Sequence, residues 1–470
     1  MKTDSVNIKE VSLGYQYRMK PNVFLKNGKR VFDQIRKEGH SLTTVDSLSR
    51  DIFRPGIFKR VFVYSKDYGH PYITAQGLMM EDPRKTQKLL SRKHTVNINY
   101  MAVHKNDILV SCAGTIGNVR FIGDFLDGFI ASQDIIRVIP NDNPGFLYAY
   151  LRSSYVYDYL QSLLYGSVVS RIEPETVKGI PIPVLDERVV SSVERSIRDS
   201  ADMRDTAISL YDIAMSKLLE YSGLGDINLD EYDYYGPHPS ERELSSFSIN
   251  RSQISSLSIN AFNLSNRIRN LAKRIENTID TKSLNEVLDQ DGLFSTGSFP
   301  RVEVECHRGI ELINQKDIFD ANIKGKYISK RGVKVSNLVT KDEIIIAGVG
   351  TLGENETFCR CVYGNKYLQG KLISGEFIRM KAASVPSGYL YLWLSSNYGF
   401  RLIRNCQAGT KLCRPVPRLL EKIPIPILPN EQMGELDAII KQSQDLFASA
   451  TFLERDAISL VEMEIQKLLK

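Results

Sequence analysis

The chain has 470 residues, of which 42% are hydrophobic and 25% are charged. These are globular values, so the chain is long enough for two domains of about 200 residues with connecting helices. The net charge of +6 permits a polyanionic partner without requiring one.

Membrane and metal sites are not expected from the composition. The sequence has no 18-residue apolar run, and residues 1–11 lack the apolar region of a signal peptide, so we expect a cytoplasmic protein without a membrane partner. The six cysteines include Cys359-x-Cys361 but no C-x-x-C pair, and the first half contains just Cys112. We therefore predict buried free thiols, no metal site and no cofactor.

One long segment occurs twice. Residues 145–185 align without a gap with residues 388–428, and the second copy follows the first at a constant spacing. The shared residues are Leu147/Leu390, Tyr148/Tyr391, Leu151/Leu394, Tyr155/Tyr398, Gly166/Gly409, Arg171/Arg414, Pro174/Pro417 and the Ile-Pro-Ile-Pro of 180–183 and 423–426. The chain is therefore one unit written twice.

The repeat extends toward the start of each half. A helix predicted over 31–39 has a counterpart within 263–280, and the similar segments 41–45 and 283–287 follow them. Short apolar runs bounded by Gly, Pro, Asn and Asp then predict strands. In the first half they are VFVYS, PYITA, DILVSCAG, VRFIG and DIIRVIP, and in the second RVEVEC, IELINQ, DEIIIAGVG, ENETFCRCVYG and EFIRMKA. Each half is predicted to be a mainly β domain that continues into helices within 145–164 and 388–403.

Two motifs suggest nucleotide or methyl-transfer chemistry, and we interpret both as structural. Residues 348–353 match G-x-G-x-x-G, but no helical pattern follows and the counterpart at 112–117 keeps Gly114, Thr115 and Gly117 alone. The shared G-T-x-G predicts a turn between two strands, where glycine allows a positive φ. Asn143-Pro144-Gly145-Phe146 hints at the Asn-Pro-Pro-Tyr/Phe clamp of amino-methyltransferases, but we interpret Pro144 and Pro386 as helix starts.

The Ile-Pro-Ile-Pro segments are predicted to be extended connectors, because proline lacks an N–H and restrains the residue before it. Each leads into a long helix, over 186–221 and 430–470. Apolar and small residues recur at alternating spacings of three and four, and Ser200 matches Ser443. We expect these helices to lie against each other, with the small residues letting their axes approach. The acidic, tyrosine-rich stretch from 222 to 246 is predicted to be a linker.

No catalytic constellation is apparent. The six histidines do not recur at equivalent positions, and H-E-x-x-H, P-loop and G-x-S-x-G motifs do not occur. Glu303 and Glu305 lie on one face of a predicted strand, more consistent with a solvated pair than with a catalytic one. A duplicated scaffold without duplicated chemistry favours a binding protein.

Basic clusters lie at comparable places in the two halves, each before the G-T-x-G turn. Phosphate binding requires charge, and base reading requires Arg, Lys, Asn or Gln on an element that enters a groove, so matched clusters favour DNA contact over a solvated loop. Arg171 and Arg414 precede the proline connectors as candidate phosphate contacts. The complete set of candidate DNA-binding residues is Arg84, Lys85, Lys88, Arg92, Lys93, His94, Arg171, Lys324, Lys326, Lys330, Arg331, Lys334 and Arg414.

The order of motifs in each half, G-T-x-G, then G-S/T…R, then I-P-I-P and a long helix, resembles the specificity subunit of type I restriction-modification systems. The resemblance implies an α+β fold with two mainly β target recognition domains, related by a pseudo-twofold axis and separated by two long antiparallel coiled-coil helices. The implied segments are a first target recognition domain (1–185), a first spacer helix (186–222), a linker (223–246), a second target recognition domain (247–428) and a second spacer helix (429–470).

The resemblance also implies a function and partners. Each half would read one part of a bipartite, asymmetric site in double-stranded DNA, and the helices would set the spacing and dock methyltransferase subunits, two per complex. Whether a restriction motor subunit joins is left open. The chain itself would be non-catalytic, with Gly114, Thr115, Gly117, Gly350, Thr351 and Gly353 as scaffold. Two alternatives are a duplicated protein-binding scaffold and a single-chain DNA-modifying enzyme.

Overall fold

The computed structural model describes residues 28–63, 65–86, 88–164, 170–227, 247–251, 254 and 257–470. The chain divides into two compact units, the first formed by Met1–Asp205 with Ser449–Lys470 and the second by Thr206–Ala448. Among the described helices, none is both long and apolar enough to cross a membrane. Most of the predicted linker lies outside the described residues, as do residues 1–27.

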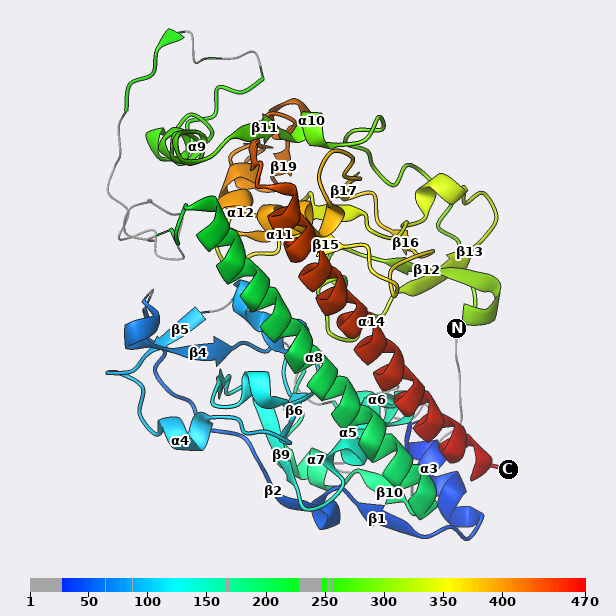
Figure 1. Ribbon diagram of the computed structural model, residues 1–470. Coiled ribbons are helices and arrows are strands. Elements are labelled where there is room, and N and C mark those ends of the chain that lie inside the picture. Colours follow the sequence, from blue (N-terminus) through cyan, green and yellow to red (C-terminus); the bar gives the residue numbers. More distant parts are fainter. Residues whose placement is uncertain are drawn as a thin grey trace. The chain divides into compact units, whose positions relative to one another are not determined.

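The first unit contains two four-stranded sheets and a two-stranded pair (Figure 1). The larger sheet, judged by the residues in its strands, has the order β2-β9-β6-β7, and the smaller one has the order β3-β5-β4-β8, with β4 and β8 parallel. Its strands are β1 (Leu42–Thr44), β2 (Ser49–Phe53), β3 (Phe62–Val63), β4 (Gly69–Ile73), β5 (Lys88–Ser91), β6 (Ile108–Ser111), β7 (Val119–Phe121), β8 (Ile130–Ala131), β9 (Ile135–Pro140) and β10 (Pro181–Pro183). Its helices before the long one are α3 (Gly28–Lys37), α4 (Ile98–Met101), α5 (Pro144–Arg152), α6 (Ser154–Ser162) and α7 (Pro174–Lys178).

The second unit repeats this order of strands. Its three-stranded sheets have the orders β13-β12-β16 and β15-β14-β17, and β12 and β16 are again parallel. Its strands are β11 (Thr281–Ser283), β12 (Gly309–Ile313), β13 (Lys326–Ser329), β14 (Ile344–Ala347), β15 (Cys361–Tyr363), β16 (Leu372–Ile373), β17 (Phe377–Met380), β18 (Gln407–Ala408), β19 (Arg414–Pro415) and β20 (Pro424–Pro426). Its helices before the long one are α9 (Asn266–Thr278), α10 (Leu284–Val287), α11 (Ser387–Ser395), α12 (Asn397–Arg404) and α13 (Pro417–Leu420).

The Ile-Pro-Ile-Pro segments are extended, as predicted, and each also forms a strand. Strand β10 pairs antiparallel with β1, where Thr43 faces Ile182, and β20 pairs in the same way with β11, where Lys282 faces Ile425. Prolines are tolerated because each pair has two strands alone, so a missing N–H interrupts no central ladder. The start of each repeat is thereby paired with its end.

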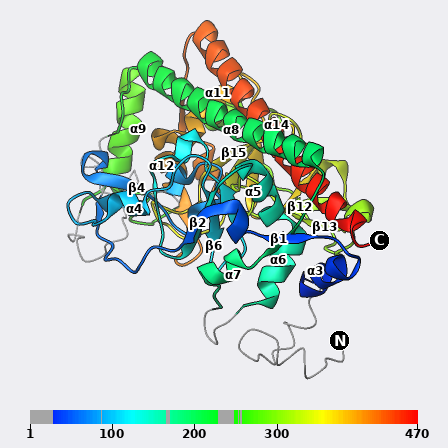
Figure 2. The ribbon, with the colours of Figure 1, turned by 90° about the horizontal axis from the view of Figure 1, so that it is seen from below.

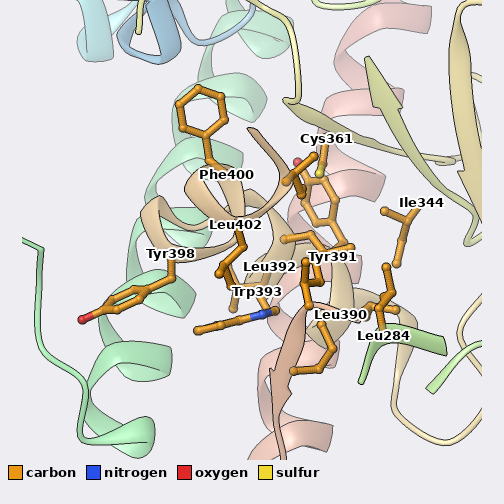
Figure 3. Close-up of a cluster of buried hydrophobic side chains, with 14 of the residues drawn as sticks. Leu284, Ile344, Cys361, Leu390, Tyr391, Leu392, Trp393, Tyr398, Phe400 and Leu402 are labelled. Carbon is orange, nitrogen blue, oxygen red and sulfur yellow. The ribbon is translucent and has the colours of Figure 1, made fainter. Parts of the chain in front are cut away.

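Aromatic residues of the repeat close the core behind these connectors. In the second unit, Trp393 is fully buried and donates from Nε1 to the Pro424 carbonyl at 3.1 Å, and its ring stacks on Tyr398 (Figure 3). At the equivalent place in the first unit, the Tyr150 hydroxyl donates to the Pro181 carbonyl. Buried polar atoms are thus satisfied by the connector, which fixes its position against the helix.

The two long helices are α8 (Glu187–Ser222) and α14 (Asn430–Lys467), and Figures 1 and 2 show them side by side. In the first unit Ser200 Oγ donates to the Ala450 carbonyl at 2.9 Å, and in the second Ser443 Oγ donates to the Ala207 carbonyl at 2.7 Å. These contacts pair early residues of one helix with late residues of the other, so the helices are antiparallel. The predicted small-residue seam is confirmed, because both serines are fully buried there.

Some local predictions were wrong. RVEVEC forms a single bridge, Glu303 to Ile328, and not a strand, whereas the lysine-bearing strands β5 and β13 were missed. Pro144 and Pro386 do stand at helix starts, as predicted, since Pro144 is the first residue of α5 and Pro386 is the N-cap of α11. Cys306 is exposed, although the other five cysteines are buried free thiols as expected.

The G-T-x-G turns lie between strands, as predicted. Gly114 and Gly117 have positive φ, but Gly350 does not. A side chain at Gly350 would instead approach Phe358 Cβ to 2.8 Å, so close packing requires that glycine.

Candidate nucleic-acid interface

Three strand ends meet at one edge of the smaller sheet in the first unit. Strand β5 lies between β3 and β4, and its last residue, Ser91, faces Gly69 at the start of β4. The Ser91 N–H donates to the Val61 carbonyl at 2.8 Å, and the Arg92 N–H donates to the Tyr68 carbonyl at 2.8 Å. The residues before β3, before β4 and after β5 are therefore neighbours.

The turn after β5, Ser91–Thr95, is stabilised by hydrogen bonds between its own residues. We name it the first basic turn. Thr95 is buried, and its Oγ1 donates to the Ser91 carbonyl at 2.6 Å. Ser91 is also buried, and its Oγ lies 3.0 Å from His94 Nδ1. Arg92, Lys93 and His94 are exposed, so the fold presents three neighbouring basic side chains from an ordered backbone.

The second unit has the same arrangement at Ser329–Val333, the second basic turn. The Ser329 N–H donates to the Val302 carbonyl at 2.9 Å, as Ser91 does to Val61. The Val333 N–H closes the turn on the Lys330 carbonyl at 3.2 Å, and Gly332 adopts φ +79. Lys330 and Arg331 are exposed. The structure thus places these two predicted residues where it places Arg92 and Lys93.

Other predicted residues lie apart from the turns or are engaged by neighbours. Arg84 forms an ion pair with Asp82 at 2.9 Å and lies over the Phe125 ring, which gives it a local structural role. Lys88 lies over Phe62, and Lys85 is half-buried beside Arg84. In the second unit, Lys326 Nζ lies 2.5 Å from Glu303 Oε1. The remaining two residues, Lys324 and Lys334, are exposed before and after strand β13.

Arg171 and Arg414 lie beside the G-T-x-G turns of their units. Ala113 bridges Arg171, and Gly350 bridges Cys413, the residue before Arg414. Arg171 lies 3.9 Å from Asp134, so the local carboxylate weighed against phosphate contact is present in the first unit. Arg414 is exposed on β19. The two arginines occupy equivalent places, but the structure does not bring them together with the basic turns.

Sequence reasoning missed exposed residues just before the strands of this edge. Arg60 precedes Val61 and Arg301 precedes Val302, so one arginine stands beside each basic turn, and both are exposed. Tyr68 precedes β4 and is 71% exposed, and Arg308, which is exposed, precedes β12. The strand pairing that makes these residues neighbours is not readable from one sequence, although recurrence of Arg-Val at 60–61 and 301–302 was a usable signal.

Carboxylates and histidine modify the charge of this edge. Glu305 lies 3.6 Å from His307 in the second unit, so that edge is less basic than its arginines alone suggest. In the first unit, partial burial lowers the pKa of His70, and the nearby Arg92 lowers it further. His70 therefore stays neutral at physiological pH, and the cations of the basic turn supply the charge.

One group of carboxylates and the buried thiols are potential metal ligands. The carboxylates of Asp124, Asp202 and Asp205 lie within 4.8 Å of one another, but Lys105 Nζ lies 2.7 Å from Asp124 and already compensates their charge. Burial raises the pKa of Cys112 to about 11 and that of Cys406 to about 12, so these thiols remain protonated at neutral pH. The charge of the aspartate group is thus partly compensated, and these two thiols are not in the thiolate form that binds metals.

The chain is similar to known proteins in part of its sequence and in its structure. Residues 52–188 match the family model described as "Type I restriction modification DNA specificity domain". No curated protein matches the chain. Solved structures similar to it include the S subunit of a type I restriction-modification system from M. genitalium, 14% identical, covering 92% of this chain and 95% of that chain with a TM-score of 0.32. Another is the HsdS subunit from Thermoanaerobacter tengcongensis, 14% identical, covering 92% and 96%, with a TM-score of 0.27.

At such TM-scores the structural likenesses carry no weight, whereas the family match covers the segment that contains both the first basic turn and the first G-T-x-G turn. The motifs that carry the resemblance also recur in the second half. Residues 52–188 are therefore similar to the DNA specificity domain of type I restriction-modification systems.

Proposed function

We propose that each unit reads one part of a bipartite, asymmetric DNA site through its basic turn. The observation that carries this proposal is the pair of exposed basic turns at the same place in two equivalent sheets. Ordered cations match the phosphate backbone, whose neutralisation supplies most of the affinity of DNA-binding proteins. Because the residues around the turns differ between units, the two half-sites should differ in sequence. The chain has no catalytic step in this proposal.

The helices α8 and α14 are proposed to dock the partner subunits. Subunits of this class assemble with methyltransferase and restriction subunits, and we propose two methyltransferase subunits here. Large apolar side chains are exposed on these helices, namely Ile213, Phe452 and Met463. We take these side chains as candidate docking contacts, because partner subunits bind through apolar surface that is exposed in the free chain.

Salt-dependent binding tests the DNA proposal. The full chain is titrated with a pool of random-sequence duplexes at several salt concentrations, and the logarithm of the affinity should fall linearly with the logarithm of the salt concentration. Replacing Arg92 and Lys93 with Ala should weaken binding roughly tenfold and reduce the salt slope by about two. The same result is expected for Lys330 and Arg331.

A matched control removes equal charge elsewhere in the first unit. Lys29 and Lys37 are exposed on α3, so their replacement with Ala should leave both affinity and slope near the values of the unaltered chain. If the basic-turn variant and the α3 variant lost DNA affinity equally, net charge and not the position of the turn would account for binding. Absence of salt-dependent binding would favour the protein-binding scaffold. For docking, Phe452→Asp and Met463→Asp should weaken co-purification of methyltransferase subunits without changing DNA affinity.

A further inference from the structure

The sheet edge that carries each basic turn is built from equivalent residues, with an informative exception. Arg60 and Arg301 are equivalent, and Arg92-Lys93 correspond to Lys330-Arg331. Immediately before the longest strand of the sheet, however, the first unit has Tyr68 and the second has Arg308. Equivalent residues with the same chemistry cannot select different bases in the two half-sites. Tyr68 and Arg308 differ in chemistry, so this position can.

The backbone presents the two side chains in the same way. The Tyr68 N–H donates to the Ser65 carbonyl at 3.3 Å, and the Arg308 N–H donates to the Glu305 carbonyl at 2.9 Å, so each residue ends a matching 3₁₀ turn. Both turns run directly into strands that pair with the serine of the basic turn, as Gly69 faces Ser91 and Gly309 faces Ser329. The contrast therefore lies in the side chains and not in the scaffold.

Each side chain suits a different base. An arginine guanidinium donates two parallel hydrogen bonds to O6 and N7 of guanine in the major groove. A tyrosine ring offers an apolar face to the methyl group of thymine and one hydroxyl for hydrogen bonding. Tyr68 is 71% exposed, which is unusual for a large aromatic side chain unless it meets a partner. Neighbouring cations on the same edge would hold the backbone of the duplex.

We propose that Tyr68 and Arg308 are base-reading residues, so that the half-site of the second unit contains a guanine contacted by Arg308 and the half-site of the first contains a thymine contacted by Tyr68. This inference rests on the proposed DNA function. The two units differ at two further equivalent positions. The first unit has His94 and Lys59, whereas the second has Gly332 and Pro300, so a polar side chain is present in the first unit alone. The Tyr68/Arg308 position is where both units offer a group able to discriminate bases.

The experiment selects bound duplexes from a random-sequence pool with the full chain and reads the base preference at every position. The variant Arg308→Lys keeps the charge but cannot form the bidentate hydrogen bond. It should bind the pool with nearly unchanged affinity, while its preference for one guanine falls about tenfold. Tyr68→Arg should replace the thymine preference in the other half-site with a guanine preference. Arg331→Ala is the matched control, because a phosphate contact should lower affinity uniformly across sequences.

The outcomes separate this inference from the proposed function. Salt-dependent, sequence-selective binding by the unaltered chain, with base preferences unchanged in Arg308→Lys and Tyr68→Arg, would overturn the base-reading assignment and leave the DNA function intact. If the unaltered chain enriched no sequence, both would fail. Thermal unfolding of each variant should match the unaltered chain, since both side chains are exposed, so loss of folding cannot imitate the expected result.

Discussion

The two units pack the long helices against the first helix of the repeat with different chemistry. In the first unit, Tyr148 donates to Glu454 at 2.5 Å, and Glu454 forms a buried ion pair with Arg204 at 2.7 Å. The equivalent residues of the second unit are Tyr391, Tyr211 and Phe447, and the two tyrosine rings meet edge-on with centroids 6.5 Å apart. One backbone arrangement thus accepts either a buried ion pair or aromatic packing.

A second contrast concerns a buried arginine on β9 of the first unit and its equivalent on β17 of the second. Arg379 forms a two-pronged ion pair with Glu343 and donates to the Leu338 carbonyl at 2.6 Å. The equivalent Arg137 faces the shorter Asp107, and its Nε and Nη1 have no hydrogen-bond partner among the described residues. Burial lowers the pKa of Arg137 to about 10. Asp107 is one methylene shorter than Glu343. The buried guanidinium of the first unit is therefore less completely hydrogen-bonded than that of the second.

The largest effect should come from Glu343→Gln. It leaves the fully buried Arg379 without its counter-charge, so we expect about 3–5 kcal/mol lower free energy of unfolding, measured by denaturant titration. Asp107→Asn is the matched control. Because Asp107 already fails to satisfy Arg137, its loss should cost less than half as much. Equal losses would show that the two arginines are equivalently paired.

Glu454→Gln should destabilise the first unit by about 3 kcal/mol, because it leaves Arg204 buried beside a neutral partner. The second unit suggests a repair, and the double variant Arg204→Phe with Glu454→Tyr installs the residues found there. We expect it to recover most of the lost stability, measured in the same titration, since apolar replacement of a buried ion pair is often neutral. A double variant less stable than Glu454→Gln would show that the two sites are not interchangeable.

A pH dependence should distinguish the two units. Burial raises the pKa of Glu81 to about 7, opposed by Arg204, Lys85 and Arg120 and reinforced by Asp82. A carboxyl whose folded pKa is raised holds its proton more tightly when folded, so stability should fall as pH rises from about 4.5 to about 7. The free energy of unfolding across this range, measured by thermal unfolding, should decline by about 3 kcal/mol. Glu81→Gln should flatten that decline, and an unchanged slope would exclude Glu81 as its source.

The smallest effect should come from the serine seam. Ser200→Ala and Ser443→Ala each remove one hydrogen bond to the facing helix, so each should cost about 1 kcal/mol in denaturant titration. Here the units should agree, because the two bonds are equivalent. Ser200 also accepts from Arg204 at 2.6 Å, so a clearly larger loss for Ser200→Ala would show that the ion pair depends on the seam.

The sequence predicts the repeat, the two long helices, the extended proline connectors and the strand-to-strand turns, because each rests on local periodicity or on the restricted backbone of proline and glycine. It does not predict the buried arginines. Arg137 lies in DIIRVIP, where a charged residue suggests a solvent-facing strand position, but it is buried and its Nη2 donates to the Met101 and Ala131 carbonyls. Nor does it predict the sheet edge at Arg60 and Tyr68, since strand pairing joins residues that are far apart along the chain.

The pairing of β1 with β10, and of β11 with β20, has a consequence for how such a chain can change. Each pairing holds the start and the end of one repeat side by side, immediately before its long helix begins. A domain could therefore be excised at this junction and another installed without moving the helix start. Under the proposed function, a unit could acquire a new DNA target in this way while its long helix stays unchanged.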